Sequence, residues 1–461
     1  MALDRILVTK REEVAARRAA LPLERVREGL EPSDRPFEAA LRSRRPAFIC
    51  EIKPASPSEG PIRPADAMGP AIETYARHAD AVSVLTDATW FGGSFDLLRR
   101  VRRSVSQPVL CKDFVLDPYQ VYEARRAGAD AVLLMLSVLD DAAWRDCARA
   151  AAECGMGILT EAHSAAETDR AVALGAPVIG LNNRNLGTLA VDLATTPALA
   201  ARVPADRVLI AESGIRTRAD VTRLRPLVDG FLVGTALMRA ADPDAALRDL
   251  VYGWTKVCGL TRPEDARHAA DRGATHGGLI FAPESPRRVT PRQALAIRRA
   301  APLRFVGVFV NESSDRVAEL AQTLDLAAVQ LHGEETPDVL DRLRRKLPDG
   351  VEIWKAVRVV DTIPANAWNA DRLLLDRYDP ARRGGTGRPF DWSVLEGVTR
   401  PDGCILSGGV GPDNLARALA TGLDAFDVNS AVESAPGEKD PVLLDRLMAA
   451  RRQAGPQESR S

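Results

Sequence analysis

Short apolar runs recur at regular intervals along this chain, and each is followed by an Ala- and Arg-rich segment of helical character. Eight runs stand in the first half: AFICEIK (47–53), AVSVLTD (81–87), PVLCKDF (108–114), AVLLMLS (131–137), GILTEA (157–162), VIGLNN (178–183), VLIAESG (208–214) and GFLVGTA (230–236). Eight more stand in the second half: TKVCGL (255–260), HGGLIF (276–281), RFVGVF (304–309), AAVQLH (327–332), VEIWKAV (351–357), RLLLDR (372–377), GCILSGG (403–409) and AFDVNS (425–430). Because the runs are almost continuously apolar rather than alternating, they are typical of parallel strands buried on both faces.

The number of runs in each half predicts the fold class. Connections of roughly 20–30 residues between them suit βαβ crossovers. Eight β/α units are the number that closes a barrel. We therefore predict an α/β protein with two tandem (β/α)8 TIM barrels, and a doubly wound open sheet is the alternative.

The chain length also favours two domains, because 461 residues exceed one ordinary core. Helical sequence ends at DPDAALRDLVYG, just before the run TKVCGL. We expect one barrel over 1–252, a second over 253–452, and a disordered polar tail over 453–461. Residues 3–45 are rich in Arg, Glu, Ala and Leu, and we expect them to add a helical segment, broken near 31–34, to the first barrel.

The charge and cysteine content exclude several classes of function. Lys and Arg number 62 against 63 Asp and Glu, so no overall positive field would attract nucleic acid or an anionic membrane. The six cysteines and five histidines are scattered without a C-x-x-C pair, and we expect buried reduced thiols, no disulfide framework and no metal site. The sequence lacks an apolar signal core and a membrane-spanning run, so we expect a cytoplasmic protein.

Polar and charged residues stand where the predicted strands of the first barrel end, which is where barrel enzymes carry their reactive groups. These positions are Glu51, Lys53, Lys112, Asp113, Glu161, Asn182, Asn183, Arg184, Glu212 and Ser213. Converging charges of both signs shift one another's pKa and can supply an acid and a base. Structural ion pairs at the barrel rim are the alternative interpretation.

Small residues follow the seventh and eighth strands of both halves, and their exposed backbone amides favour an anion such as phosphate. They are Ser213, Gly214, Gly234 and Thr235 in the first half, and Ser407, Gly408, Gly409, Asn429 and Ser430 in the second. A hydroxyl-bearing loop with Ser56 follows the first strand. Phosphorylated small molecules are therefore the expected substrates.

The second barrel has a different set of strand-end residues. Cys258 ends its first strand, Asp376 ends its sixth, and Arg287 lies in the loop after its second. A thiol at this position can act as a base if its thiolate is favoured, and a buried inert thiol is the alternative. Residues 384–387 (GGTG) are typical of a loop that closes over substrate.

These motifs resemble two known enzyme families. The segments FICEIKPASPSEG (48–60), LCKDF (110–114), LTEA (159–162), GLNNRNL (180–186) and AESGI (211–215) resemble indole-3-glycerol-phosphate synthase. The segments KVCGLTR (256–262), GVFVN (307–311), AVQLHGEE (328–335), GGTGRPFDW (384–392), LSGGV (406–410) and DVNSAVES (427–434) resemble phosphoribosylanthranilate isomerase. The matches run from about residue 35 to 450, in an order similar to the bifunctional bacterial enzyme.

The first resemblance implies closure of an indole ring with loss of carbon dioxide and water. It implies that Lys112 is the general acid, that Glu161 is the acid/base of the dehydration, and that Lys53 lies near the substrate carboxylate. It further implies substrate-orienting, anthranilate-binding and phosphate-binding roles for Glu51, Asn182, Glu212, Phe114, Arg184, Ser56, Ser213, Gly214, Gly234 and Thr235. Residues 3–45 resemble the extra helix with which the family covers the barrel mouth.

The second resemblance implies an Amadori rearrangement of N-(5-phosphoribosyl)anthranilate. It implies that Asp376 protonates the ribose ring oxygen, that Cys258 removes the proton from C2, and that Arg287 binds the anthranilate carboxylate. Gly408, Gly409, Asn429 and Ser430 are the implied phosphate site. We expect no cofactor, no macromolecular partner and a monomer.

Two other functions stay open at this point. One is a pair of phosphosugar isomerases from another pathway, against which the Cys258 and Asp376 pair argues. The other is a non-catalytic scaffold that binds a phosphorylated ligand, against which the retention of acid and base positions at both mouths argues.

Overall fold

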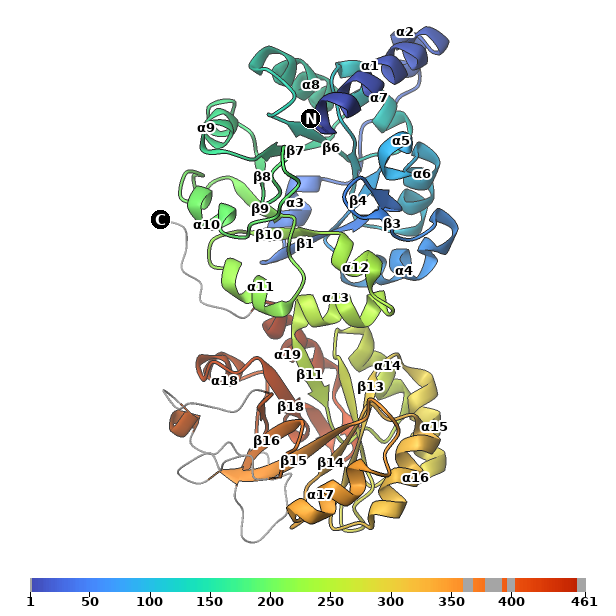
Figure 1. Ribbon diagram of the computed structural model, residues 1–461, viewed down its shortest axis with the longest axis vertical. Coiled ribbons are helices and arrows are strands. Elements are labelled where there is room, and N and C mark those ends of the chain that lie inside the picture. Colours follow the sequence, from blue (N-terminus) through green and yellow to red (C-terminus); the bar gives the residue numbers. More distant parts are fainter. Residues whose placement is uncertain (1, 360–367, 378–391, 396–402, 454–461) are drawn as a thin grey trace. The chain divides into compact units, whose positions relative to one another are not determined.

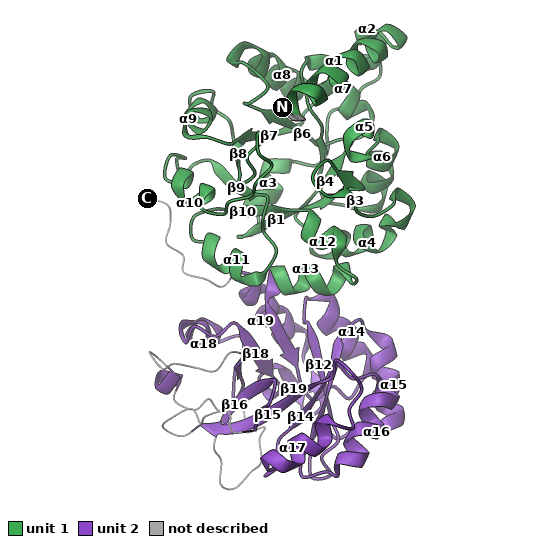
Figure 2. Ribbon diagram, viewed as in Figure 1, with its two compact units in different colours: residues 1–250, 456–461 green, residues 251–455 purple. Residues whose placement is uncertain are grey.

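The computed structural model describes residues 2–359, 368–377, 392–395 and 403–453 (Figure 1). The chain forms two compact units that divide between Leu250 and Val251 (Figure 2). This division falls inside α13 (Pro243–Tyr252), and only Gly253 separates α13 from the first strand of the second unit. Each unit is described below by itself.

The first unit contains a closed barrel of eight parallel strands, in the order β1-β10-β9-β8-β7-β6-β5-β4. The strands are β1 (Ala47–Ile52), β4 (Ala81–Leu85), β5 (Val109–Lys112), β6 (Ala131–Met135), β7 (Gly157–Ala162), β8 (Val178–Asn182), β9 (Val208–Glu212) and β10 (Gly230–Val233). β1 closes the ring, since it pairs with β4 on one side and β10 on the other. Every predicted run of the first half is therefore a barrel strand.

The second unit contains a second closed barrel, with its strands in sequence order. They are β11 (Trp254–Val257), β12 (His276–Ile280), β13 (Arg304–Phe309), β14 (Ala328–Leu331), β15 (Glu352–Val359), β16 (Arg372–Arg377), β17 (Ile405–Leu406) and β18 (Ala425–Val428). β11 pairs with both β12 and β18. The predicted fold class is confirmed for both halves, and the open-sheet alternative is wrong.

Helices connect the strands, as parallel pairing requires. Those of the first unit, besides α13, are α1 (Ala2–Ala20), α2 (Leu23–Arg27), α3 (Phe37–Arg42), α4 (Gly69–His78), α5 (Ala88–Phe91), α6 (Phe95–Ser104), α7 (Pro118–Arg126), α8 (Asp141–Glu153), α9 (Ala165–Ala173), α10 (Thr195–Ala200), α11 (Arg218–Leu224) and α12 (Thr235–Arg239). Those of the second are α14 (Pro263–Asp271), α15 (Pro291–Ala300), α16 (Ser314–Leu324), α17 (Pro337–Arg344), α18 (Leu415–Ala420) and α19 (Pro441–Gln453). Short 3-10 turns lie at Ala65–Met68, Trp392–Leu395 and Ser430–Val432. Two small hairpins follow, β2 (Ala55–Ser56) with β3 (Gly60–Pro61) and β19 (Glu433–Ala435) with β20 (Glu438–Lys439).

Side-chain caps set where several helices begin. Ser94 Oγ accepts a hydrogen bond from Leu97 N at the start of α6, and Asp140 Oδ1 accepts one from Ala143 N at the start of α8. Each cap satisfies a backbone N–H that has no partner inside its helix.

None of the helices in the described part of the chain is both long and apolar enough to span a membrane.

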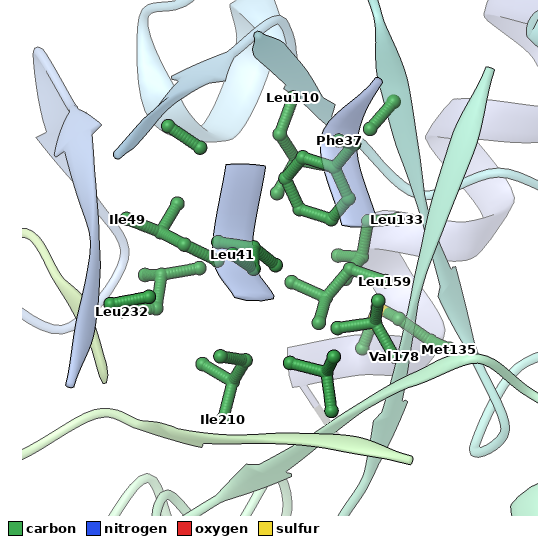
Figure 3. Packing of buried hydrophobic residues seen from close by; sticks show 14 residues of the cluster. Phe37, Leu41, Ile49, Leu110, Leu133, Met135, Leu159, Val178, Ile210 and Leu232 are labelled. Atoms are coloured by element: carbon green, nitrogen blue, oxygen red, sulfur yellow. The ribbon is translucent and has the colours of Figure 1, made fainter. Parts of the chain in front are cut away.

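The core of the first barrel fills its interior and is closed at one end by α3. Phe37 and Leu41 of α3 pack among inward-facing side chains of the strands (Figure 3). Ala47 and Val178, which also belong to this cluster, are the first residues of their strands. Helix α3 therefore closes the N-terminal end of the barrel, which is opposite the end where strands deliver reactive side chains.

The N-terminal segment forms three helices. The predicted break near 31–34 lies in the stretch 28–36 between the second and the third, and Pro22 adds a further break after the first. Helix α1 lies on the mouth side, where Lys10 Nζ is 2.7 Å from Asp87 Oδ2 and 2.9 Å from Asp113 Oδ1, in the loops after β4 and β5. One segment therefore serves both ends of the barrel.

In the second barrel the core centres on large aromatic side chains. Trp354 of β15 is buried among Val306, Ala328, Leu374 and Ile405, and Trp254 packs against this cluster. The ring centroids of the two tryptophans are 4.9 Å apart.

The tail that was expected to be disordered, 453–461, cannot be described beyond its first residue. Gln453 ends α19, and the rest of this range lies outside the described residues.

Candidate active sites

One lysine and three glutamates meet at the mouth of the first barrel. Lys112 Nζ, at the end of β5, lies 3.0 Å from Glu212 Oε2, 3.4 Å from Glu51 Oε2 and 3.9 Å from Glu161 Oε2. Lys53 Nζ lies 2.8 Å from Glu51 Oε1. Lys112 and the three glutamates belong to four different strands, so barrel closure brings together the residues that the sequence placed at separate strand ends.

Burial and charge shift the proton affinities of this cluster in opposite directions. Burial alone would lower the pKa of Lys112, but the carboxylates of Glu212, Glu51 and Glu161 raise it well above its usual value. Burial raises the pKa of Glu212, and the neighbouring charge of Glu161 raises it further, against the opposing effect of Lys112. The cluster can therefore hold a proton that an incoming substrate can take up.

His163 is a member of this site that the sequence interpretation missed. Its Nε2 lies 3.1 Å from Glu161 Oε1, and its Nδ1 lies 3.3 Å from Glu167 Oε2. Burial favours the neutral ring, but the bonds to these two carboxylates raise the pKa of His163 to about 10. Conversely, burial would raise the pKa of Glu161, but His163 lowers it to about 2. The signal for His163 was its position two residues after Glu161, since alternate residues of an extended chain share a face.

The charged cluster opens into a pocket of about 1040 Å³, part of which is open to solvent. Its wall combines charged groups with apolar side chains such as Phe91, Phe114 and Leu186. The predicted site residues that line it are Glu51, Lys53, Lys112, Phe114, Glu161, Asn182, Arg184, Ser213, Gly214, Gly234 and Thr235. Glu212 lies behind Lys112 rather than on this wall, and Ser56 is buried with its Oγ 3.5 Å from Ser58 Oγ.

The backbone beside this pocket is shaped by residues with positive φ and by close approaches. Ser213 and Gly214 have φ angles of 64° and 84°. A Cβ added to Gly234 would lie only 2.2 Å from Glu51 Oε1. Arg184, which follows the neighbouring strand β8, donates from Nη1 to Leu189 O at 3.0 Å. Small residues here let backbone amides and the Glu51 carboxylate lie close together.

At the mouth of the second barrel, Lys256 lies at the centre of a buried polar cluster. Its Nζ is 3.2 Å from Cys258 Sγ, 2.8 Å from Gln330 Oε1 and 2.9 Å from Asp427 Oδ1. Burial and the charge of Asp427 raise the pKa of the Cys258 thiol, and Lys256 opposes them. The ammonium group therefore lies in position to stabilise a thiolate at Cys258.

Asp376 belongs to the same mouth. His332 Nε2 lies 3.0 Å from Asp376 Oδ2, and His332 Nδ1 lies 3.0 Å from Gln330 Nε2. The sequence interpretation identified Cys258 and Asp376 but missed Lys256, Gln330 and His332. The available signal was again two-residue spacing, because Gln330 lies on β14 and His332 directly follows that strand. Lys256 and Cys258 have the same relation to β11.

Arg287 lies beside the same mouth and is held by a carboxylate. Its Nε and Nη2 donate to Glu433, with the shortest N–O distance at 2.7 Å, and Lys439 Nζ lies 2.7 Å from Glu433 Oε1. A Cβ added to Gly259 would lie 2.7 Å from Arg287 Cδ and 2.8 Å from Asn429 Oδ1. Gly259 thereby lets Arg287 and Asn429 lie close to the end of β11.

The predicted phosphate residues of the second barrel follow β17 and β18. Gly408 and Gly409 have positive φ angles of 73° and 91°, and Ser430 begins a 3-10 turn. Asn429 Oδ1 accepts a hydrogen bond from Lys439 Nζ at 3.0 Å.

The predicted closing loop, 384–387, lies outside the described residues. Over the ranges that the structure covers, no group of three or more His, Cys, Asp and Glu side chains converges as metal ligands do.

Family models match the two halves of the chain. The model for indole-3-glycerol phosphate synthase matches residues 3–250, and that for N-(5'phosphoribosyl)anthranilate (PRA) isomerase matches residues 255–450. Crystal structures of phosphoribosyl anthranilate isomerase from Thermus thermophilus and Thermotoga maritima align with 34% and 31% identity and TM-scores of 0.37 and 0.38. Each alignment covers 43% of this chain, and 97% and 98% of theirs.

Relatives that carry both halves match almost end to end. The tryptophan biosynthesis protein TrpCF of Yersinia pestis is 46% identical over 455 residues, which cover 98% of this chain and 94% of that protein. TrpCF of Vibrio parahaemolyticus is 47% identical over 452 residues, which cover 97% and 93%. The chain therefore belongs to the TrpCF family, and it is a bifunctional enzyme of tryptophan biosynthesis with indole-3-glycerol-phosphate synthase and phosphoribosylanthranilate isomerase activities.

Proposed function

We propose that Lys112 and Glu161 are the acid and base that close the indole ring in the pocket of the first barrel. The substrate is 1-(2-carboxyphenylamino)-1-deoxyribulose 5-phosphate. When its aromatic carbon attacks the C2 ketone, the ketone oxygen needs a proton, and Lys112 Nζ is a protonated donor at neutral pH. Carbon dioxide then leaves, and Glu161 moves the protons that accompany loss of water.

The observation that carries this proposal is the ammonium of Lys112 held among three carboxylates at an open pocket. As the Lys112 proton moves to substrate, Glu212, whose raised pKa lets it carry a proton, can return one to the lysine. Glu51 and Glu212 hold the lysine, and Lys53, which pairs with Glu51, supplies a positive charge for the substrate carboxylate. Asn182 orients the substrate from the end of β8.

Both ends of the substrate find matching chemistry on the pocket wall. Phe114 and the neighbouring apolar side chains suit the anthranilate ring. Opposite them, the backbone at Ser213, Gly214 and Gly234, with Arg184, suits the phosphate. Thr235 adds a hydroxyl on the same wall, and Ser56 supports its neighbour Ser58 rather than the pocket itself.

In the second barrel, Asp376 gives its proton to the ribose ring oxygen of N-(5-phosphoribosyl)anthranilate, and the ring opens to an iminium. Cys258, as a thiolate beside Lys256 Nζ, takes the proton from C2, which leaves an enolamine that tautomerises to the ketone. Arg287 binds the anthranilate carboxylate, which replaces or joins Glu433 at the guanidinium. Gly408, Gly409, Asn429 and Ser430 hold the phosphate.

Two single substitutions test this assignment. Lys112→Ala is expected to abolish indole closure and to leave isomerisation unchanged, and Cys258→Ala is expected to do the reverse. Both are measured with purified enzyme and each substrate separately, so each variant is the folding control for the other. Loss of both activities in a folded variant would refute the two-site assignment.

The enzyme is further proposed to work as a monomer in the cytoplasm. All six cysteines are buried reduced thiols, as suits a reducing compartment. Sedimentation velocity at micromolar concentration checks the first point, with 49.8 kDa as the expected mass. A species of twice that mass would contradict it.

A further inference from the structure

Three polar side chains join the thiol and the carboxylate of the second barrel in one hydrogen-bonded chain. Lys256 Nζ contacts both Cys258 Sγ and Gln330 Oε1. Gln330 Nε2 contacts His332 Nδ1, and His332 Nε2 contacts Asp376 Oδ2. Cys258 directly follows β11, Asp376 lies on β16 and Gln330 lies on β14, so the chain crosses between strands that are not neighbours.

The positive charge of Lys256 determines which atom donates and which accepts in every hydrogen bond from Lys256 to Asp376. An ammonium group only donates, so the Gln330 atom that faces Lys256 is the carbonyl oxygen. The Gln330 amide nitrogen also only donates, so His332 Nδ1, which faces it, must accept. A neutral imidazole that accepts at Nδ1 carries its hydrogen on Nε2 and donates it to Asp376.

Burial protects this polarity from exchange with solvent. Lys256 is 0% exposed and Gln330 is 1% exposed. Asp427 Oδ1, 2.9 Å from Lys256 Nζ, keeps the lysine charged in this surrounding. With one acceptor for each of its three hydrogens, the ammonium has no spare bond through which to reorient.

We propose that Lys256, Gln330 and His332 are positioning residues of the isomerase, which together hold His332 as the neutral ring that donates from Nε2 to Asp376. The inference rests on the proposed role of Asp376 as the acid. When Asp376 gives up its proton, the N–H aimed at Oδ2 stabilises the carboxylate that forms. A neutral ring also places no positive charge beside the Asp376 carboxyl group before the reaction.

Gln330→Glu tests the proposal with almost no change in shape. A carboxylate only accepts, so His332 must place a hydrogen on Nδ1. The ring then either loses its donor to Asp376 or becomes a cation beside it, and both states impair the acid. We expect isomerase kcat to fall about tenfold or more, because a wrong imidazole tautomer in a serine protease costs ~10⁴-fold. An unchanged kcat in a folded variant overturns the proposal.

Substitutions of His332 supply a second arm. His332→Gln keeps an N–H that can reach Asp376 and is expected to retain more isomerase kcat than His332→Leu, which has no donor. Equal kcat in the two variants would mean that the donor is immaterial. His268→Gln is the matched control, since His268 pairs with Asp445 at 2.7 Å outside the mouth, and it should leave both activities unchanged. Indole closure by the same chains reports that the first barrel is intact.

A spectroscopic measurement does not depend on activity at all. In ¹⁵N-histidine-labelled enzyme at neutral pH, the His332 signals, assigned by their loss in His332→Gln, should show hydrogen on Nε2 alone. Gln330→Glu should move a hydrogen to Nδ1. Hydrogen on Nδ1 in the unaltered enzyme overturns the inference, whereas full isomerase activity in Asp376→Asn would instead overturn the proposed acid.

Discussion

Glycines beside the first mouth set where its carboxylates can lie. A Cβ added to Gly180 of β8 would fall 1.9 Å from Glu212 Oε1, and one added to Gly234 would fall 2.2 Å from Glu51 Oε1. These distances are far shorter than any contact between non-bonded atoms. Both carboxylates that hold Lys112 therefore occupy space that only a missing side chain provides.

Gly180→Ala should consequently displace Glu212 from Lys112. We expect indole closure to slow by about 10- to 100-fold, because a shift of about 1 Å in a catalytic group has effects of this size. The isomerase should be unaffected. Steady-state kinetics with each substrate check this, and Gly69→Ala, where an added Cβ meets only Arg100 Nη2 at 3.9 Å, is the control. Normal synthase kcat in Gly180→Ala would mean that Glu212 does not need its position.

The pair of His163 and Glu161 predicts a pH-dependent contribution to stability. The pKa of His163 is raised from 6.5 to about 10 in the folded protein. A raised pKa means that the folded state binds the proton more tightly, so this contribution is complete below about pH 6.5 and is lost as the pH rises through about 10.

His163→Gln is therefore expected to lower the urea midpoint of the first barrel most at pH 6, and progressively less towards pH 10. Unfolding followed through loss of synthase activity, beside the unaltered enzyme at each pH, makes the measurement. A difference that grows with pH would have the wrong sign. The isomerase in the same samples serves as an internal reference.

At the scale of elements, α3 shows how a local helix completes a barrel. Phe37 is 1% exposed, and a Cβ added to Gly157, the first residue of β7, would lie 2.6 Å from Phe37 Cβ. The phenyl ring thus fills the end of the barrel interior where β7 starts. Phe37→Ala should leave a cavity at this position rather than disturb the mouth.

We expect Phe37→Ala to destabilise the first barrel by about 3–5 kcal/mol, the usual cost for a buried aromatic side chain. Chemical denaturation followed through synthase activity measures the loss. Val8→Ala is the control, since Val8 is 53% exposed on α1 and its truncation should cost little. A change below 1 kcal/mol would mean that the barrel end tolerates an open cavity.

At the scale of the whole molecule, two active sites on one chain raise the question of how the intermediate travels. The product of the second barrel is the substrate of the first. We expect free diffusion, because each site lies at the mouth of its own barrel. The covalent link between the two is then not required for the coupled reaction.

A mixture of Lys112→Ala and Cys258→Ala enzymes tests this expectation. Each variant supplies the activity that the other lacks, so the mixture should convert phosphoribosylanthranilate to indole-3-glycerol phosphate at the rate of the unaltered enzyme at equal site concentration. The transient level of the intermediate, measured during the reaction, should also match. A long delay seen only in the mixture would indicate transfer within one chain.

The sequence by itself determined the strands, the barrels and which residues stand at the strand ends. Continuous apolar runs at regular spacing encode strands buried on both faces, and this information is local. Lys112, Glu161, Cys258 and Asp376 could be identified because the ends of parallel strands meet at one rim whatever the details of packing. The same reasoning does not say which rim residues touch.

Only the tertiary structure decided those contacts and the place of the N-terminal helices. Lys256 meets Gln330 and Asp427, which are 74 and 171 positions away, because the register at which the barrel closes puts these side chains at one level. Likewise, α3 occupies the end opposite the mouth because an interior of that width needs Phe37 and Leu41 to fill it. Periodicity along a chain records which face is buried, whereas hydrogen-bond partners follow from the geometry of closure.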